Sequence, residues 1–184
     1  MVPRVTPAAA APPAPTDPAR AACAGRAERV LALPDSASTD ALGKALAALL
    51  RPGDTVLLAG PIGAGKSHLA RALIRAAFRA GGAEPPEVPS PTYTLVQPYA
   101  APAGEIVHAD LYRLGDTSEL EELGLTEAFG TALCLVEWPD RLGAAAPDAA
   151  LCIDLAPEGD GRRATLSGDP ARWADPLAAL GVGP

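Results

Sequence analysis

The 184-residue sequence contains no asparagine, only 4% aromatic residues and only two lysines among its 15 basic side chains. Guanine-specific GTPases normally read the base with an NKxD segment, so the missing asparagine argues against that class. The few aromatic residues predict a core built mainly from Ala, Leu and Val, as in an α/β interior. The formal net charge is −7, which leaves no broad cationic surface and disfavours extensive direct binding of nucleic acid.

Cysteines and long apolar runs are also scarce. The three cysteines, Cys23, Cys134 and Cys152, form an odd, widely spaced set without a CxxC pair, so neither a disulfide framework nor a zinc site is predicted. We expect Cys134 and Cys152 to be small buried hydrophobes and the setting to be reducing and cytoplasmic. No run reaches the roughly 18 apolar residues that a membrane span needs.

The composition divides the chain into two parts. Residues 1–26 are rich in Ala and Pro and are predicted to be a disordered tail, because such a tract cannot pack or form a signal-peptide helix. Residues 27–184 are predicted to form a single domain. The periodicity of that part predicts alternating strands and helices, and hence an α/β sheet sandwiched by helices. Strands are expected at 28–33, 55–59, 92–99, 105–112, 131–139, 149–155 and 162–168, and helices at 39–50, at 66–80, within 117–129 and near Trp173.

One segment carries a specific motif. Residues 60–67 read GPIGAGKS and match GxxxxGK[ST] between a predicted strand and a predicted helix. Glycines let such a loop turn its N–H groups inward around phosphates, and the helix N-terminus adds partial positive charge. Lys66 would reach the β- and γ-phosphates, and the Ser67 hydroxyl would bind Mg²⁺. The predicted nucleotide is ATP, and the expected binding residues are Gly60, Ile62, Gly63, Ala64, Gly65, Lys66 and Ser67.

Two acids follow buried-looking strands. Asp110 comes after IVHA, and Glu137 comes after LCLV. P-loop enzymes need an acid at a strand end to hold Mg²⁺, directly or through water, and to orient the attacking group. A solvated edge charge is the ordinary explanation for one such acid, but two of them beside a P-loop favour catalytic roles for both.

Several blocks in order resemble the TsaE family, the small bacterial P-loop ATPases of tRNA threonylcarbamoyladenosine biosynthesis. The blocks are GPIGAGKSHLARAL, SPTYTLVQPY, HADLYRL, EELGLTEAF and LVEWPDRL, and the resemblance spans about residues 33–142. It implies a P-loop NTPase-like mixed sheet flanked by helices. It also implies a Mg²⁺-dependent ATPase, weak by itself, that binds the TsaD–TsaB heterodimer and resets it between rounds of carbamoyl transfer to adenosine 37 of tRNA. Contact with tRNA would be only indirect.

The resemblance also implies roles for individual residues. Lys66 would hold the phosphates, Ser67 and Glu137 would be the Mg²⁺ ligands, and Asp110 would position water or metal. Thr92 would sense the γ-phosphate, and Trp138 would pack near the nucleotide or the partner. The chain departs from the family at position 61, where Pro replaces the usual acid, and at position 68, where His replaces a common Thr.

Some alternatives stay open at this point. His68 could approach the α-phosphate or could be an ordinary exposed side chain. His108 could transfer a proton or could simply bond to the sheet edge or to a neighbouring carbonyl. Arg113 and Arg141 could contact phosphate or could form ordinary ion pairs. A small-molecule kinase is the alternative function, although its candidate lid at residues 140–148 holds only one arginine.

Overall fold

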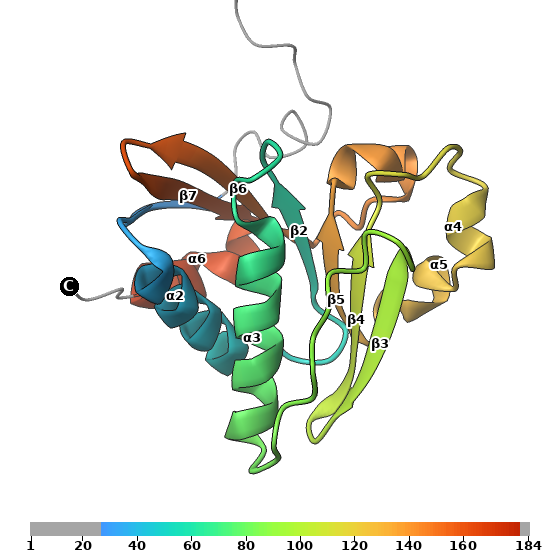
Figure 1. Ribbon diagram of the computed structural model, residues 1–184, viewed down its shortest axis with the longest axis horizontal. Helices are drawn as coiled ribbons and strands as arrows, with labels where there is room; N and C mark the ends of the chain where they lie inside the picture. Colours follow the sequence, from blue (N-terminus) through green and yellow to red (C-terminus); the bar gives the residue numbers. More distant parts are fainter. Residues whose placement is uncertain (1–26, 181–184) are drawn as a thin grey trace, which may run out of the picture.

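The computed structural model describes residues 27–180, so the predicted tail at residues 1–26 lies outside the described residues. The described chain forms a seven-stranded sheet in the order β1-β7-β6-β2-β5-β4-β3 (Figure 1). The predicted mixed α/β sheet is therefore confirmed. Its strands are β1 (Ala27–Leu33), β2 (Thr55–Ala59), β3 (Val96–Ala101), β4 (Gly104–Asp110), β5 (Leu133–Glu137), β6 (Leu151–Glu158) and β7 (Gly161–Gly168).

The middle of the sheet is parallel and its margins are antiparallel. Strands β6, β2, β5 and β4 pair in parallel, whereas β3 pairs antiparallel with β4, and β7 pairs antiparallel with β6 and β1. Four of the five residues of β2 and all five of β5 are buried, as expected for central strands covered on both faces. Parallel strands bring their carboxyl ends to one edge, which is where ligands bind in such sheets.

Helices cover both faces of this sheet. Helices α2 (Ser36–Leu49) and α3 (Lys66–Ala80) lie side by side in front of it in Figure 1, and they pack into a core that includes Val56 and Leu58. The alternate residue Leu57 faces a second core, because side chains alternate across a strand. That second core also contains residues of α4 (Glu119–Glu122), α5 (Leu125–Ala128) and η1 (Pro139–Ala145). Helix α6 (Pro170–Ala179) packs against β1 and β7.

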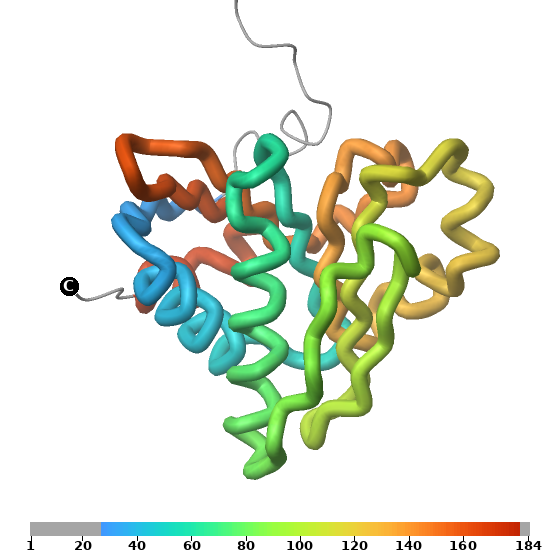
Figure 2. Tube along the Cα trace, viewed as in Figure 1, coloured from blue at the N-terminus to red at the C-terminus, as the bar shows by residue number. Residues whose placement is uncertain are grey.

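The expected strands and helices are present with ends shifted by a few residues, but the helix η1 after β5 was not predicted, and β3 begins later than expected. The strand predicted at 92–99 begins only at Val96, because residues 91–94 form a turn in which the Leu95 amide donates to the Pro91 carbonyl at 2.7 Å. Leu95 has φ 63°, which strand geometry does not allow. Figure 2 shows the chain after α3 running back along that helix before it enters β3. This return brings the turn to the carboxyl end of β4.

Candidate nucleotide-binding site

The loop between β2 and α3 has the backbone that its motif predicts. Gly60, Gly63 and Gly65 have φ of 129°, 77° and 102°, all in the left-handed range that favours glycine. At Gly60 the requirement is also spatial, because a Cβ atom there would lie 2.2 Å from the carbonyl oxygen of Leu155. The loop is thus held against β6 while α3 begins at Lys66 and directs its first N–H groups into the loop.

Lys66 is enclosed within this loop. Its side chain is only 5% exposed, and its Nζ donates to the carbonyl oxygens of Gly60 at 2.7 Å and Pro61 at 2.9 Å. The same ammonium lies 3.9 Å from the centre of the Trp138 ring, within cation–π range. Burial lowers the pKa of Lys66 from its ordinary value, and the nearby carboxylates of Glu137 and Asp110 oppose that shift.

Glu137 lies at the carboxyl end of β5, facing the start of α3. Its side chain is 2% exposed, and its two carboxylate oxygens have different partners. Oε2 accepts from the Ser67 hydroxyl at 2.9 Å, and Oε1 lies 2.9 Å from Nε2 of His108. Residues from a helix and two strands, far apart in the sequence, therefore meet at one carboxylate.

Asp110 lies next to Glu137 because the two residues are paired in the parallel register of β4 and β5. Its Oδ2 accepts from the Thr92 hydroxyl at 2.8 Å, and its Oδ1 accepts from the Tyr112 amide at 3.0 Å. The Thr92 hydroxyl also lies 2.9 Å from the Ser90 hydroxyl. The turn at residues 91–94 is thus tied to the same carboxyl edge of the sheet as the loop.

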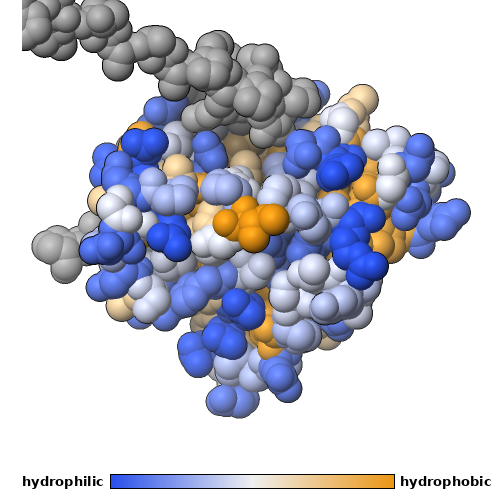
Figure 3. Space-filling view, turned by 45° about the horizontal axis from the view of Figure 1, so that its top comes forward, coloured by the Kyte–Doolittle hydropathy of each residue, from blue (hydrophilic) through white to orange (hydrophobic). Residues whose placement is uncertain are grey.

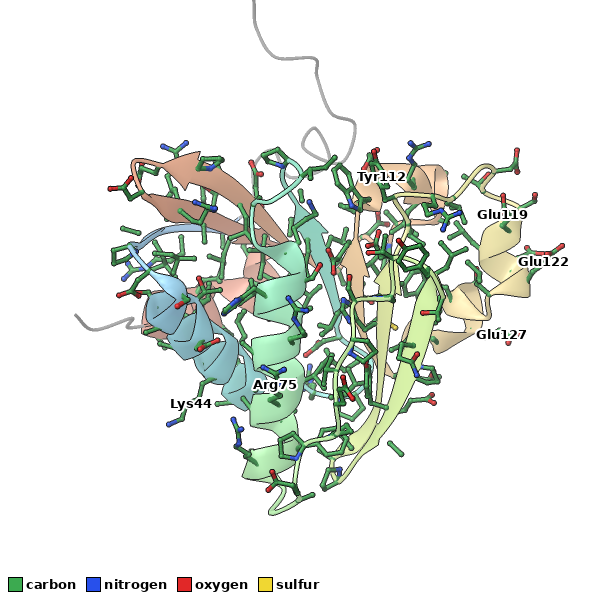
Figure 4. The ribbon with its side chains drawn as sticks, in the orientation of Figure 1. Lys44, Arg75, Tyr112, Glu119, Glu122 and Glu127 are labelled. Atoms are coloured by element: carbon green, nitrogen blue, oxygen red, sulfur yellow. The ribbon has the colours of Figure 1, made fainter. Side chains whose placement is uncertain are left out.

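These groups surround one cavity of about 390 Å³. Two of the lining residues, Ile62 and Tyr112, are exposed. Figure 3 shows a largely hydrophilic surface on which apolar groups form separate patches. Figure 4 places Tyr112 at this edge, while Glu119, Glu122 and Glu127 lie apart from it on α4 and α5. The lining residues are Ile62, Gly63, Gly65, Lys66, Ser67, His68, Arg71, Thr92, Asp110, Tyr112, Glu137 and Trp138.

A second cavity of about 190 Å³ adjoins the loop on its other side, toward β1 and α2. Gly65 and His68 line both cavities, so the two spaces meet at the start of α3. The His68 ring lies 2.8 Å from Asp40 of α2 through Nε2. On the same side, Arg162 donates from Nη2 to the carbonyl oxygen of Gly63 at 3.2 Å.

The residues present fit a nucleoside triphosphate with Mg²⁺. A hydroxyl and two carboxylates at one edge form the oxygen donor set that Mg²⁺ prefers, and Lys66 with the N-terminus of α3 supplies positive charge beside them. Among the described residues no group of three or more His, Cys, Asp and Glu side chains is placed to hold a metal by itself, at this edge or elsewhere. An oxygen-ligated ion bound together with phosphate is therefore the arrangement that this edge could hold.

The structure brings all the predicted site residues to this edge. Ala64 and Gly60 shape the loop, and Trp138 packs under Lys66 with its ring 4.9 Å from that of Tyr112. The two arginines that could have contacted phosphate have other partners. Arg141 pairs with Asp140 at 3.8 Å, and Arg113 lies 5.7 Å from the Tyr93 ring. Neither arginine lines the cavity.

Sequence reasoning missed two features of the site. The bond between His108 and Glu137 was not predicted, although His108 stands two residues before Asp110 and must therefore share its face of the strand. Arg71 lines the cavity one helical turn after Ser67, a spacing that could have suggested it.

The two described cysteines differ in burial. Cys134 is buried as predicted, and burial raises the pKa of its thiol to about 12. Cys152, which was also expected to be buried, is only partly buried.

Fold and site together define the class to which the chain belongs: P-loop proteins, with a glycine loop between a parallel strand and a helix and acids on the neighbouring strands. A family model described as "Threonylcarbamoyl adenosine biosynthesis protein TsaE" matches residues 33–165, and the chain belongs to this family. The resemblance drawn from the sequence motifs is thereby confirmed.

Two relatives support this assignment, and one solved structure shares the fold. The chain is 36% identical over 140 residues to the tRNA threonylcarbamoyladenosine biosynthesis protein TsaE of Haemophilus influenzae, covering 73% of this chain and 85% of the relative. It is 36% identical over 126 residues to TsaE of Bacillus subtilis, covering 68% and 75%. The crystal structure of Bacillus subtilis YdiB superposes with a TM-score of 0.65 at 23% identity, covering 84% of this chain and 95% of YdiB, which shows the shared fold.

No described helix combines the length and the apolar character that a membrane crossing requires.

Proposed function

We propose that this chain is the ATP-binding and ATP-hydrolysing subunit of the machinery that makes threonylcarbamoyladenosine at position 37 of tRNA. The observation that carries the ATPase part is the convergence of Lys66, the Ser67–Glu137 pair and the Thr92–Asp110 pair on one cavity. Family membership supports the place in tRNA modification. The threonylcarbamoyl chemistry belongs to the partner proteins, TsaD and TsaB, which this subunit resets between rounds.

Each residue has a distinct task in this proposal. Lys66 and the N–H groups of the loop bind the β- and γ-phosphates, and Ser67 and Glu137 hold Mg²⁺. Mg²⁺, when bound, supplies charge that neutralises the phosphate oxygens. Asp110 is fixed by Thr92 and by the Tyr112 amide, so its carboxylate is oriented to accept a hydrogen bond from the attacking water.

The cavity toward β1 and α2 suits the nucleoside. It begins where Gly65 and His68 line both spaces, and it offers both apolar and polar groups, including Leu33 and Thr39. A nucleotide whose phosphates lie on the loop would extend into it without crossing α3. We therefore assign this cavity to the adenine and ribose, with His68 between base and phosphates.

A kinase fits less well than an ATPase. The segment considered as a lid, residues 140–148, lies largely within η1, whose Leu142 is fully buried in the second core. A lid that closes over a second substrate would have to leave that core.

The experiment that tests the proposal is mass spectrometry of nucleosides from bulk tRNA. Host cells depleted of this protein would be complemented with wild type, Lys66→Ala or Lys44→Ala, the last being the exposed control at the only other lysine. We expect threonylcarbamoyladenosine to return with wild type and Lys44→Ala but not with Lys66→Ala. An unchanged nucleoside level in depleted cells, together with ATP binding by the pure protein, would refute the tRNA role and favour the kinase. Because partners complete the machinery, slow hydrolysis by the isolated chain is expected.

A further inference from the structure

His108 is a buried polar residue that the proposed function does not use. It lies in β4 on the face that packs under α3, with 0% exposure, and its strand neighbours on that face are Ile106 and Asp110. Across the strand pair, His108 is registered with Leu135. An apolar side chain would suit such surroundings better, because a buried polar group costs free energy unless it is hydrogen-bonded.

The hydrogen bond of His108 determines which ring nitrogen carries a proton. A carboxylate can only accept, so the 2.9 Å contact with Oε1 of Glu137 requires the proton on Nε2. The other ring nitrogen, Nδ1, has no hydrogen-bond partner among the described residues. The unpartnered side of the ring shows that its one strong interaction is the bond to Glu137.

Glu137 needs such a donor. The terminal torsion of a glutamate is broad, so rotamer preference alone does not fix the plane of its carboxylate. One oxygen, Oε2, accepts from the Ser67 hydroxyl, which can donate this proton while its lone pairs face the proposed Mg²⁺ site, so the other oxygen, Oε1, needs a donor of its own. His108 is the other described donor to this carboxylate.

We propose that His108 is a positioning residue that holds Oε1 of Glu137 and so keeps Oε2 directed toward Ser67 and the Mg²⁺ site. This inference rests on the proposed function, since it assigns His108 a part in binding Mg²⁺ with the nucleotide. Outer partners of this kind orient the ligands of a metal and commonly change metal affinity about 10- to 100-fold when they are removed. His108 does not touch the phosphates or the water and is not a catalytic residue.

Two amide variants of His108 test whether the hydrogen bond to Glu137 matters or whether any polar side chain at this position is sufficient. The side-chain amide nitrogen of His108→Gln reaches about as far as Nε2, whereas that of His108→Asn reaches only about as far as Nδ1. The affinity of each protein for a non-hydrolysable ATP analogue would be measured by calorimetry with increasing Mg²⁺ and with EDTA. Val107→Ala, a buried change on the opposite face of β4, controls for loss of packing.

We expect wild type, His108→Gln and Val107→Ala to need similar Mg²⁺ concentrations, and His108→Asn to need about tenfold more. Affinity in EDTA should be similar for all four. The inference is overturned if His108→Asn keeps the wild-type Mg²⁺ requirement, or if His108→Gln loses as much as His108→Asn. If wild type itself shows no Mg²⁺-dependent binding, the proposed function fails instead.

A measurement on the wild-type protein covers the case in which the variants do not fold. The chain has only two histidines, His68 and His108, so long-range ¹H–¹⁵N spectra of the imidazoles are simple to assign. We expect the His108 ring to carry a proton on Nε2. A ring protonated only at Nδ1 cannot donate to Glu137 and would overturn the inference.

Discussion

The two sides of the nucleotide site are built in opposite ways. The loop side, residues 60–67, is continuous in the sequence and is shaped by its own glycines. The acid side brings together Thr92, Asp110 and Glu137, which come from a turn and two strands and meet only through the register of the sheet. The loop side can therefore bind phosphate as a local unit, whereas the acid side depends on the whole fold for its geometry.

This difference predicts a division of labour. The loop side should govern nucleotide binding, and the Thr92–Asp110 pair of the acid side should govern turnover, while Glu137 joins the two sides through its bond to Ser67. Variants on either side test this division. It is supported if they change nucleotide affinity and kcat separately, and contradicted if both quantities fall together.

The largest effect is expected for Lys66→Ala. It removes the cation that the loop encloses, and losing one such preorganised group typically costs about 100- to 1,000-fold. We expect kcat/KM for ATP to fall by at least about 100-fold and nucleotide binding to become undetectable or very weak, as measured by calorimetry and phosphate release with the TsaD–TsaB partners present. Lys44→Ala should behave as wild type. Near-normal ATP affinity in Lys66→Ala would contradict the binding role of the loop side.

Asp110→Asn should affect turnover without affecting binding. The variant keeps the size of the side chain but weakens its ability to orient water, so kcat should fall about 100-fold. Because the proposed Mg²⁺ ligands are Ser67 and Glu137, affinity for a non-hydrolysable analogue should change less than about threefold, which is less than about 0.7 kcal/mol of binding free energy. Asp175→Asn, an exposed acid on α6, is the control. A parallel loss of affinity and kcat in Asp110→Asn would show that the two sides are not separable.

The same contrast explains what the sequence could predict. The loop and its flanking elements were predicted to the residue, β2 at 55–59 and α3 at 66–80, because a motif, a continuous apolar run and helical spacing are all local signals. Asp110 and Glu137 were predicted as strand ends, but their adjacency depends on the pairing of β4 with β5, which no local pattern encodes.

The sequence did not predict the turn before β3 or the bond of His108, and the reasons are related. Residues 92–95 have the β-branched and aromatic character of a strand, yet tertiary contacts hold them as a turn so that Thr92 reaches Asp110. The sequence left His108 between proton transfer and a bond to a carbonyl or the sheet edge, and it could not indicate Glu137, which lies 29 residues away on the next strand.

Gly60→Ala tests whether the loop, besides its own glycines, also depends on its contact with β6. The added Cβ would clash with the carbonyl of Leu155, and φ of 129° is unfavourable for alanine. We expect the free energy of unfolding to fall by about 2 kcal/mol or more, measured by chemical denaturation. Gly63→Ala, where a Cβ would meet nothing within 4 Å but φ is 77°, should cost about 1 kcal/mol. Equal losses in the two variants would mean that contact with β6 does not shape the loop.

The smallest effect is expected for Thr92→Val, which removes the hydroxyl that donates to Asp110 while keeping the shape of the side chain. A hydrogen bond to a charged group contributes about 1.5–3 kcal/mol, and the Tyr112 amide still holds the other oxygen, so kcat should fall about tenfold at unchanged analogue affinity. The control is Thr94→Val, an exposed threonine in the same turn.

The combination with Asp110→Asn decides how Thr92 acts. If Thr92 works only by orienting Asp110, then Thr92→Val should cost little more once Asp110 is already Asn, because the two changes break one interaction. If the losses multiply instead, Thr92 must also act on the phosphate directly, as a γ-phosphate sensor would. In that case Thr92 would serve both the loop side and the acid side. The division between nucleotide binding and turnover would then not coincide with the division between the continuous loop and the residues that the fold brings together.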